Sequence, residues 1–379
     1  MPELLIGLMS GTSLDGADGV LVDLSSRRPQ VIASASAPFA AEFRAELLAL
    51  NSPCDNELHR AALAGNQIAV IYAQVVHNLL AQSRRIGIEA TDVRAIGAHG
   101  QTVRHRPGAN PGIAGDPRAY TLQLNNPALL AELTGIDVVA DLRSRDIAAG
   151  GQGAPLVPAF HQQVFAQSGS KRSVLNIGGI ANLSVLPADH NAPVLGFDCG
   201  PGNALMDHWC QQHTGQAFDD QGAWAAGGQC QPDVLQALFD EPYFTLAPPK
   251  STGRDLFSVN WLQHKLAPFA SCKPQDIQRT LVELTASACC KSFTSYSNES
   301  KSLIVCGGGA FNSYLMQRLQ SLLPEVSVLS SDRFGLPPLQ VEATAFAWLA
   351  QQTLSRLAGN LPSVTGAAGP RVLGAIYPA

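Results

Sequence analysis

Residues 7–18 read Gly7-Leu8-Met9-Ser10-Gly11-Thr12-Ser13-Leu14-Asp15-Gly16-Ala17-Asp18, and they continue an apolar segment that begins at Leu4. The apolar residues predict a β-strand, and the glycine and hydroxyl residues after them predict a turn. Residues 20–24 are apolar again, so the turn joins two strands of a hairpin. P-loop and Rossmann sites differ, because their anion lies at the N-terminus of a helix.

The composition of this turn favours the binding of a phosphate group. Glycine lets the backbone approach an anion closely, and hydroxyl and N–H groups donate hydrogen bonds to phosphate oxygens. A neighbouring carboxylate such as Asp15 can hold the Mg²⁺ ion that accompanies ATP. The alternative is a glycine-rich hairpin without a ligand, but the density of hydroxyl and acidic residues favours a phosphate site.

Length and composition limit the class of protein. A chain of 379 residues with 46% hydrophobic content exceeds the size of most single cores, so we expect two domains. A net charge of −5 offers no basic surface to nucleic acid. We find neither a membrane-spanning apolar run nor a signal peptide, and eight cysteines without a CxxC pair indicate reduced thiols. These features predict a cytoplasmic protein without a nucleic-acid or membrane partner.

Hydrophobic periodicity divides the chain into two similar α/β halves, each of which begins with a glycine-turned hairpin. The predicted strands lie within residues 3–36 and at 94–98, 136–140, 173–177, 181–186, 194–197 and 302–306. The predicted helices lie at residues 42–50, 56–86, 202–213, 276–295 and 340–356. We place the domains at residues 1–145 and 146–379, with the C-terminal tail able to join the first. Two such halves are suited to grip a polyphosphate from both sides of a cleft.

Two further segments place polar or glycine residues after predicted strands. Asp198 follows an apolar strand and precedes a tight turn, where it could act as a general base or simply cap the turn. Residues alone leave these two roles equally open. The triplet Gly307-Gly308-Gly309 also follows a strand, and it could lie flat against a planar ring or a ribose.

Several charged and polar side chains could contact a substrate. Glu342 and the segment from Asp141 to Asp146 lie beside glycine-rich or strand-end segments, and the alternative for them is surface solvation or a structural ion pair. The segment from Asp141 to Asp146 favours the structural role. His99 and Gln101 form a candidate polar contact to a substrate, and the alternative for His99 is a buried, hydrogen-bonded ring.

Long motifs give the chain a resemblance to a known family. They are residues 7–18, Ala-His-Gly-Gln-Thr-Val-Arg-His at 98–105, the glycine-rich 148–158, Leu-Asn-Ile-Gly-Gly-Ile-Ala-Asn at 175–182, Gly-Phe-Asp-Cys-Gly-Pro-Gly-Asn at 196–203, and Gly-Leu-Pro-Pro-Leu-Gln-Val-Glu-Ala at 335–343. Their order and spacing resemble those of the anhydro-N-acetylmuramic acid kinase family along nearly the whole chain.

The resemblance implies a two-domain fold of the actin, hexokinase and Hsp70 type, which is ribonuclease H-like, with ATP in the interdomain cleft. It also implies a reaction that uses ATP and Mg²⁺. Water opens the 1,6-anhydro ring of anhydro-N-acetylmuramic acid while the freed O6 is phosphorylated, which gives N-acetylmuramic acid 6-phosphate and ADP. Such a reaction belongs to cell-wall recycling, and kinases of this kind are often homodimers.

The resemblance also implies roles for particular residues. ATP phosphates would bind at Gly11, Thr12, Ser13, Leu14, Asp15, Gly16, Ala17 and Asp18. Gly307, Gly308 and Gly309 would lie by the nucleotide, Glu342 would contact the sugar, and Asp198 would take a proton from the attacking water. One base suffices, because the γ-phosphorus captures the departing oxygen and so does the work of a general acid.

The chain departs from the family pattern at two places. Cys199 stands where the family usually has threonine, so a hydroxyl bond to phosphate or water would be lost. Residues 124–127 read Leu-Asn-Asn-Pro, where the family commonly has Gly-Asp, which puts in doubt a substrate or interdomain contact made by that aspartate.

Two other classes of function compete with the kinase. A non-catalytic, nucleotide-gated switch of the actin or chaperone class would use the same nucleotide grip. An ATP-independent sugar hydrolase is the third class, and it would leave the loop at residues 7–18 unexplained.

Overall fold

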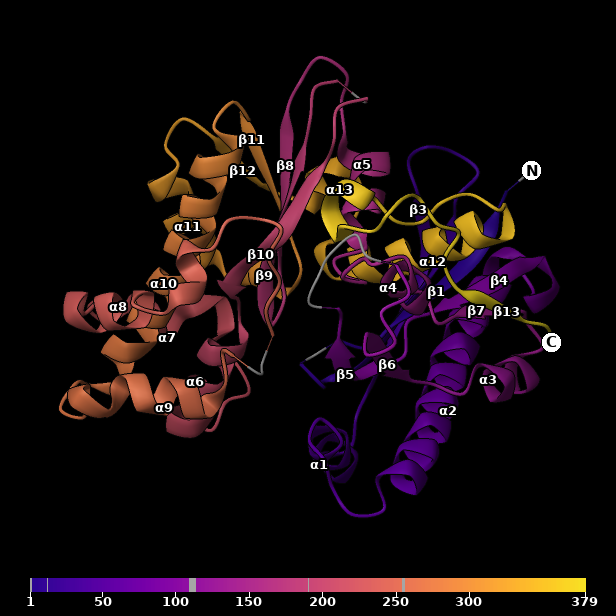
Figure 1. The fold of residues 1–379 in the computed structure, drawn as a ribbon, viewed down its shortest axis with the longest axis horizontal. Helices are drawn as coiled ribbons and strands as arrows, with labels where there is room; N and C mark the ends of the chain where they lie inside the picture. Colours follow the sequence, from indigo (N-terminus) through magenta and orange to yellow (C-terminus); the bar gives the residue numbers. More distant parts are fainter. Residues whose placement is uncertain (1, 12, 109–113, 190, 254–255) are drawn as a thin grey trace. The chain divides into compact units, whose positions relative to one another are not determined.

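The protein was analysed as a computed structural model that describes residues 2–11, 13–108, 114–189, 191–253 and 256–379 (Figure 1). Contacts within the chain divide it into two units: Met1–Val164 with Gln340–Ala379 form the first unit, and Phe165–Leu339 form the second. The predicted boundary at residues 145 and 146 lies earlier in the chain. The C-terminal segment belongs to the first unit, because its last strand pairs there.

The first unit contains a mixed sheet with the strand order β13-β7-β4-β1-β2-β3. Its strands are β1 (Leu4–Met9), β2 (Gly16–Asp23), β3 (Gln30–Pro38), β4 (Val93–Ala98), β7 (Val138–Ala140) and β13 (Ala375–Tyr377). β1 is antiparallel to β2 and parallel to β4, and β2 is antiparallel to β3. A separate hairpin consists of β5 (Gln101–Arg106) and β6 (Tyr120–Leu124).

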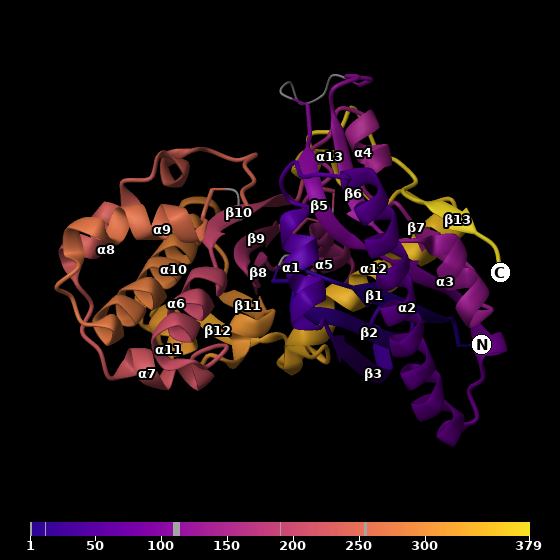
Figure 2. The same ribbon diagram turned by 90° about the horizontal axis from the view of Figure 1, so that it is seen from below.

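Helices cover both faces of this sheet. They are α1 (Ala41–Ala49), α2 (Glu57–Ser83), α3 (Pro127–Thr134), α4 (Ser144–Ala148), α5 (Val157–Phe165), α12 (Val341–Leu354) and α13 (Pro362–Thr365). Side chains alternate along a strand, so Leu4, Ile6 and Leu8 share one core with α2, whereas Gly7 faces α12. Figures 1 and 2 show α12 along β1 and β4, and α2 beside β2.

The approach of α12 explains two glycines. A Cβ atom at Gly7 would overlap the carbonyl oxygen of Ala343, and a Cβ atom at Gly97 would overlap that of Phe346. Only glycine allows the helix backbone to lie so close to β1 and β4. Gly7, the first residue of the stretch that predicted the phosphate turn, is therefore a packing residue.

The second unit repeats the central strand order of the first, with the order β10-β9-β8-β11-β12. Its strands are β8 (Arg172–Ile177), β9 (Ile180–Leu186), β10 (Leu195–Pro201), β11 (Ser302–Cys306) and β12 (Ser327–Ser330). β8 is antiparallel to β9 and parallel to β11, as β1 is to β2 and β4. In both units the first three strands form two successive hairpins, and the following strands of the shared order pair in parallel. This is the strand order of the ribonuclease H-like fold, so the predicted fold class is confirmed.

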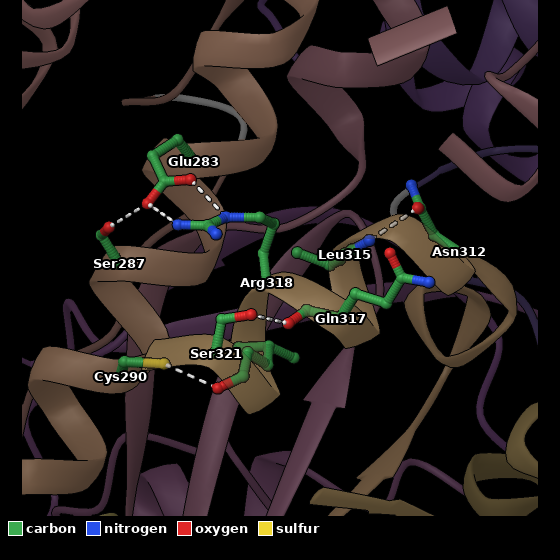
Figure 3. A network of polar contacts seen from close by, with 9 residues as sticks. Glu283, Ser287, Cys290, Asn312, Leu315, Gln317, Arg318 and Ser321 are labelled. Atoms are coloured by element: carbon green, nitrogen blue, oxygen red, sulfur yellow. Dashed lines mark hydrogen bonds and ion pairs between the residues drawn. The ribbon is translucent and has the colours of Figure 1, made fainter. Parts of the chain in front are cut away.

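A helical layer packs on the sheet of the second unit. It consists of α6 (Ala204–Thr214), α7 (Ala223–Ala226), α8 (Pro232–Phe239), α9 (Val259–Leu266), α10 (Pro274–Ser297) and α11 (Ser313–Leu322). The long helix α10 contacts β8, β9 and β10. Figure 3 shows how α10 is joined to α11: the Arg318 guanidinium donates hydrogen bonds to both carboxylate oxygens of Glu283, at 2.8 and 3.2 Å. None of the described helices combines the length and the apolar composition that crossing a membrane requires.

Candidate functional site

The loop between β1 and β2 lies at the carboxyl end of β1, where ligands of α/β sheets bind. The Leu14 amide donates a hydrogen bond to the Gly11 carbonyl at 3.2 Å, and the Phe39 amide donates one to the Asp15 carbonyl at 3.0 Å. The nearest atom to a Cβ built at Gly11 is the Ser13 hydroxyl at 3.7 Å, so the backbone there is open. Thr12 lies outside the described residues.

The eight residues expected to bind ATP phosphates occupy different environments. The Leu14 and Ala17 side chains are buried in the core, and Gly16 packs against the backbone of Ala37 at the end of β3. The side chains of Leu14 and Ala17 therefore have structural roles, Gly16 allows a close backbone approach, and only the backbone of these residues can face a ligand. Gly11 and Ser13 are partly exposed, whereas Asp15 is exposed.

Two carboxylates accompany this loop. The Asp15 side chain is 73% exposed, and an Arg44 nitrogen lies 3.6 Å from one of its oxygens, which is a weak surface ion pair. Asp18 is on β2, and part of its surface is exposed. Neighbouring protein atoms nevertheless desolvate its carboxylate. This desolvation, and then the nearby Asp15 charge, raise the pKa of Asp18. A carboxylate whose ionised form is disfavoured by burial and by a neighbouring acid suits a bound cation. Within the described ranges, no group of three or more acidic, histidine or cysteine residues is arranged to hold a metal ion.

A closed ring of hydrogen bonds ties the loop to the end of β4. The Gly100 amide donates to the Tyr72 hydroxyl at 3.1 Å, and the Ser10 hydroxyl donates to the Gly100 carbonyl at 3.0 Å. Since the single Ser10 proton is used there, the contact of 3.0 Å between the two hydroxyls is donated by Tyr72. The segments that follow β1 and β4 are thereby held together.

His99 and Gln101 flank this ring and are withdrawn from water. His99 is 6% exposed, its ring packs on Phe346, and its Nε2 accepts a hydrogen bond from Arg143 Nε at 2.9 Å. Burial, and then the Arg143 charge, hold the pKa of His99 well below its ordinary value, so the ring is neutral. Gln101 is fully buried, and its Nε2 donates to the Gly11 carbonyl at 3.1 Å. Both predicted contact residues therefore lie next to the loop.

The segment after β7 has a structural centre in Asp146. Its Oδ2 accepts a hydrogen bond from the Gly153 amide at 2.8 Å, and its Oδ1 accepts from Asn360 Nδ2 at 2.6 Å and from the Thr365 hydroxyl at 2.8 Å. Asp146 is fully buried. It joins the glycine-rich stretch to the C-terminal segment, and the predicted structural role is confirmed for this residue.

Glu342 is in the first turn of α12, the helix that Gly7 and Gly97 admit to the sheet. It is partly exposed, unlike its neighbours Val341 and Ala343, which are buried. The next residue, Ala343, has its carbonyl against Gly7 of β1, so Glu342 lies at the end of α12 that packs on β1.

In the second unit, three glycine turns meet at the carboxyl ends of β8, β10 and β11. The Gly202 and Asn203 amides donate to the Gly179 and Gly178 carbonyls at 2.9 and 2.8 Å, and Asn203 Nδ2 donates to the Ile177 carbonyl at 3.1 Å. These bonds join the β8–β9 turn to the start of α6.

The glycine triplet after β11 contains one open position between two packed ones. Gly307 has φ of 78°, and a Cβ there would meet the Ile177 carbonyl oxygen at 2.7 Å. A Cβ at Gly309 would meet the Ile177 side chain at 2.5 Å. At Gly308 the nearest atom is Asn203 Nδ2 at 3.4 Å. Gly308 is thus the position of the triplet at which the backbone is accessible.

Asp198 lies within β10, where the pairing register with β9 shifts, and not at the end of a strand as the sequence predicted. The strand continues to Pro201 because β9 pairs with it beyond the irregularity. Asp198 Oδ2 accepts a hydrogen bond from the Thr252 amide at 2.9 Å, and the Asp198 amide donates to the Lys250 carbonyl at 3.2 Å. One carboxylate oxygen is therefore held by the Thr252 amide, and the Asp198 backbone is held by Lys250 of the same segment.

Sequence reasoning missed the segment that surrounds Asp198. Tyr243 donates its hydroxyl to the Asp198 carbonyl at 2.8 Å, and Lys250 Nζ lies 4.7 Å from the centre of the Tyr243 ring. Burial lowers the pKa of Lys250, and the nearby Asp198 charge opposes that shift. The run Lys250-Ser251-Thr252-Gly253 has the same hydroxyl and glycine character as the first loop, and this signal could have identified it.

The two departures from the family pattern have structural explanations. Cys199 is 1% exposed and belongs to the core of the second unit with Cys289 and Cys290, so its thiol has a packing role, and the loss of a hydroxyl contact to a ligand stays a prediction. Asn126 is the N-cap of α3: its Oδ1 accepts from the Leu129 amide at 3.0 Å. Asparagine and aspartate are equally good caps, so this exchange preserves the helix.

Comparisons with known proteins agree with one another over the full length. The family model of anhydro-N-acetylmuramic acid kinase matches residues 3–379. A protein named anhydro-N-acetylmuramic acid kinase from Variovorax paradoxus is 64% identical, with 100% of this chain and 99% of the relative covered. Relatives of the same name from Albidiferax ferrireducens and Bordetella pertussis are 59% and 55% identical, with 100% of this chain and 100% and 96% of the relatives covered.

Solved structures are similar at low identity. An activator of the 2-hydroxyisocaproyl-CoA dehydratase from Clostridium difficile with bound ADPNP is 12% identical, with a TM-score of 0.49 and coverage of 93% of this chain and 98% of that one. A ROK family glucokinase from Streptomyces griseus in complex with glucose and AMPPNP is 11% identical, with a TM-score of 0.40 and coverage of 92% and 99%.

Proposed function

The chain belongs to the anhydro-N-acetylmuramic acid kinase family, and from this premise we propose that it couples hydrolytic opening of the 1,6-anhydro ring to phosphorylation of O6. The match over residues 3–379, with relatives of 55–64% identity over their whole length, carries the proposal. The enzyme is a kinase that uses ATP. The products are N-acetylmuramic acid 6-phosphate and ADP, and the reaction serves the recycling of cell-wall sugars.

The reaction balances with one water, one sugar and one ATP. The water oxygen bonds to C1 as the bond from C1 to O6 breaks, and O6 bonds to the γ-phosphorus as the bond to the β-phosphate oxygen breaks. Asp198 accepts the proton that the water loses and later releases it to solvent. The leaving oxygen needs no acid, because phosphorus takes the place of a proton.

The surroundings of Asp198 support its role as the base. The Thr252 amide donates a hydrogen bond to one carboxylate oxygen at 2.9 Å, which leaves the other oxygen as the one proposed to accept a proton. The register shift in β10 sets Asp198 apart from the regular ladder, as bulges near active sites often do.

Other residues bind and orient the reactants. We assign the ATP phosphates to the backbone and hydroxyl groups of residues 11–18, where Gly11 leaves room for close approach. Gly308 offers the open backbone of the triplet to the nucleotide. Glu342, His99 and Gln101 are the groups assigned to the sugar.

Mg²⁺ is the expected companion of ATP, and Asp15 is its proposed ligand. Asp18 is close enough to Asp15 to add negative charge at the site. Mg²⁺ commonly takes one or two carboxylates together with phosphate oxygens and water, so a full protein cage is not needed. When bound, the ion neutralises phosphate charge.

Compartment and assembly are further proposals. Eight free cysteines, several of them buried, suit a reducing compartment, and we place the enzyme in the cytoplasm. The homodimer expected from the family stays a prediction, and light scattering coupled to size-exclusion chromatography measures it directly.

Replacement of the base gives a direct test. Asp198→Asn keeps an oxygen that can accept the Thr252 bond but cannot take a proton from water, so turnover should fall by a factor of about 10³ or more, while the Kd for ATP stays within about twofold. Asn203→Ala in the neighbouring turn is a control for packing. Retained turnover in Asp198→Asn would remove Asp198 as the base.

A further inference from the structure

Two buried thiols are in contact within the core of the second unit, beside Asp198. Cys199 follows Asp198 in β10, Cys289 is in α10, and each cysteine is 1% exposed. The two thiols share a hydrogen bond, and this bond, together with burial, raises the pKa of Cys289 well above its ordinary value. The group whose pKa is raised keeps the proton, so Cys289 donates and the Cys199 sulfur accepts. Since the family usually has threonine at position 199, the pair does not belong to the reaction that the family shares.

The packing of α10 on β10 places the two thiols opposite each other. The Thr285 hydroxyl donates to the Pro201 carbonyl at 3.1 Å, and this contact fixes the helix against the strand. From Pro201 back to Cys199 the strand spans about 7 Å, and from Thr285 to Cys289 the helix spans about 6 Å. Cys289 therefore lies level with Cys199, and both belong to the same hydrophobic core.

Cys199 falls at the irregularity of β10. Asp198 pairs with Asn182 of β9 and Gly200 pairs with Ala181, so Cys199 is the extra residue of a β-bulge and takes no position in the pairing register. A bulged residue can shift while the ladder on either side of it stays paired. Because Asp198 is the adjacent residue, a shift of Cys199 moves Asp198 as well.

The next cysteine of α10 faces a different element. Cys290 Sγ lies 4.0 Å from the Leu319 carbonyl oxygen of α11 (Figure 3). Burial, and then the Glu283 charge, raises the pKa of Cys290 to about 12. Successive side chains of a helix point about 100° apart, so Cys289 can pack on β10 while Cys290 packs on α11.

We propose that Cys199 and Cys289 are a redox-sensitive pair, which hydrogen peroxide joins in a disulfide that displaces Asp198 and stops turnover. The Cys199 sulfur, which accepts the hydrogen bond, attacks a peroxide oxygen: an S–O bond forms, the O–O bond breaks, and the thiol proton leaves in a water molecule. The Cys289 sulfur then attacks the resulting sulfenic acid, so that the S–S bond forms, the S–O bond breaks and a second water leaves. The two thiols lose two electrons, and peroxide is reduced to two water molecules.

Formation of this bond requires a movement of the bulge. An S–S bond of about 2.05 Å is much shorter than a hydrogen-bond contact between two sulfurs, so the two backbones must approach by roughly 1–2 Å. The Thr252 amide holds Asp198 in the reduced protein, and the movement draws Asp198 away from this contact. A displacement of about 1 Å at a reacting group can lower turnover about 10²-fold. This consequence rests on the proposed function, in which Asp198 is the base, whereas the disulfide itself does not.

Burial sets the rate of the reaction. The raised pKa of Cys289 leaves little of its thiolate, and peroxide, which is small and uncharged, enters when the core opens locally. The pair therefore responds to sustained oxidation and not to a brief exposure. In a reducing compartment, disulfides that do form are usually catalytic or redox-sensing, which agrees with a reversible bond at this place.

The mass of the oxidised protein tests the chemical step without any substrate. The full chain is treated with hydrogen peroxide, free thiols are blocked under denaturing conditions, and a protease digest is analysed without reduction. We expect peptides linked through Cys199 and Cys289, two hydrogens lighter than the reduced peptides together, and fragmentation assigns the two positions. Dithiothreitol should separate them. Absence of this link at a dose that oxidises the partly exposed Cys272 would overturn the inference.

The adjacent cysteines of α10 provide matched variants for the effect on turnover, each compared with its own untreated sample. Wild type and Cys290→Ser should lose kcat about 10²-fold after peroxide and regain it with dithiothreitol, while the Kd for ATP stays within about twofold. Cys289→Ser should keep its kcat after the same treatment. Cys199→Thr removes the other thiol and gives a second resistant variant if Cys289→Ser folds poorly.

Two results would contradict the effect on turnover: an equal loss of kcat in Cys289→Ser, or a linked wild-type protein that keeps its kcat. Failure of the untreated wild type to phosphorylate any anhydro sugar would instead contradict the proposed function, and the mass of the linked peptides does not depend on that function.

Discussion

The two units share a strand order, yet their first hairpins are built for different contacts. In the first unit, β1 and β2 are joined by the long, hydroxyl-bearing loop at residues 10–15, and Gly7 within β1 admits the backbone of α12. In the second unit, β8 and β9 are joined by Gly178 and Gly179 alone, whose carbonyls are held by the start of α6. The first hairpin loop can contact a ligand through side chains, whereas the second turn can contact one only through its backbone.

This difference shows that fold and chemistry are specified by separate residues of the same motif. The strand order brings both turns to the carboxyl edges of their sheets. Gly7 serves the packing of the first unit, whereas Gly11 leaves open backbone at the loop. A glycine in a motif is therefore assigned to packing or to a ligand only by what a Cβ atom would meet there.

The largest expected effect separates packing glycines from open ones. Gly7→Ala places a Cβ against the backbone of Ala343, which cannot move without α12, so the free energy of unfolding of the first unit should fall by about 3–5 kcal/mol. In Gly178→Ala the nearest atom is the Ile180 carbonyl oxygen at 3.7 Å, and the change should stay within about 0.5 kcal/mol. Urea unfolding followed by circular dichroism measures both, and equal losses would contradict the assignment.

The next effect distinguishes the units by acid sensitivity. In the described part of the chain the buried histidines are His99 and His161, both of the first unit. Burial lowers the pKa of His161 to about 3 and holds the pKa of His99 well below its ordinary value. Below about pH 6.5 the unfolded chain binds these protons and the folded unit does not, so stability falls by up to about 1.4 kcal/mol per pH unit for each ring.

Hydrogen exchange between pH 7 and 5.5, corrected for intrinsic rates, measures this difference unit by unit. Amides of β4 should lose protection as the pH falls, and amides of α10 should lose much less. His161→Gln, which cannot titrate, should reduce the pH dependence in the first unit by about half. An equal response in both units would show that the buried histidines do not control acid stability.

The smallest effect tests the two open glycines as ligand contacts. Gly11→Ala and Gly308→Ala fit the folded units, so Tm should change little, while the added methyl group should weaken ATP binding by about 10-fold each, or about 1.4 kcal/mol. Isothermal titration with ATP and Mg²⁺ measures the Kd. Gly309→Ala is the matched control. Its Cβ would overlap the Ile177 side chain, so this variant should lower Tm. An unchanged Kd in Gly11→Ala or Gly308→Ala would remove that glycine from the nucleotide site.

The sequence predicted the central strands well because their signals are local. Residues 302–306 correspond to β11 as observed, and the predicted helix at residues 340–356 contains α12. The β5–β6 hairpin and β13 were missed. β13 is three residues long and pairs with β7 from far along the chain, so no local pattern marks it.

The candidate site was predictable at the level of motifs but not of individual roles. Asp198 and the loop at residues 7–18 were found from glycine, hydroxyl and acidic residues near strand ends. The register shift at Asp198 and the Thr252 contact depend on tertiary pairing, which sequence does not show.

The central claim is that water opens the ring while O6 captures phosphate, and the product's mass tests it most directly. The enzyme is incubated with anhydro-N-acetylmuramic acid and magnesium ATP in oxygen-18 water, and the sugar phosphate is examined by fragment mass spectrometry. We predict one heavy oxygen at C1, phosphate on O6, and one ADP per sugar. A product with phosphate but no heavy oxygen at C1, or ring opening that proceeds without ATP, would contradict the account.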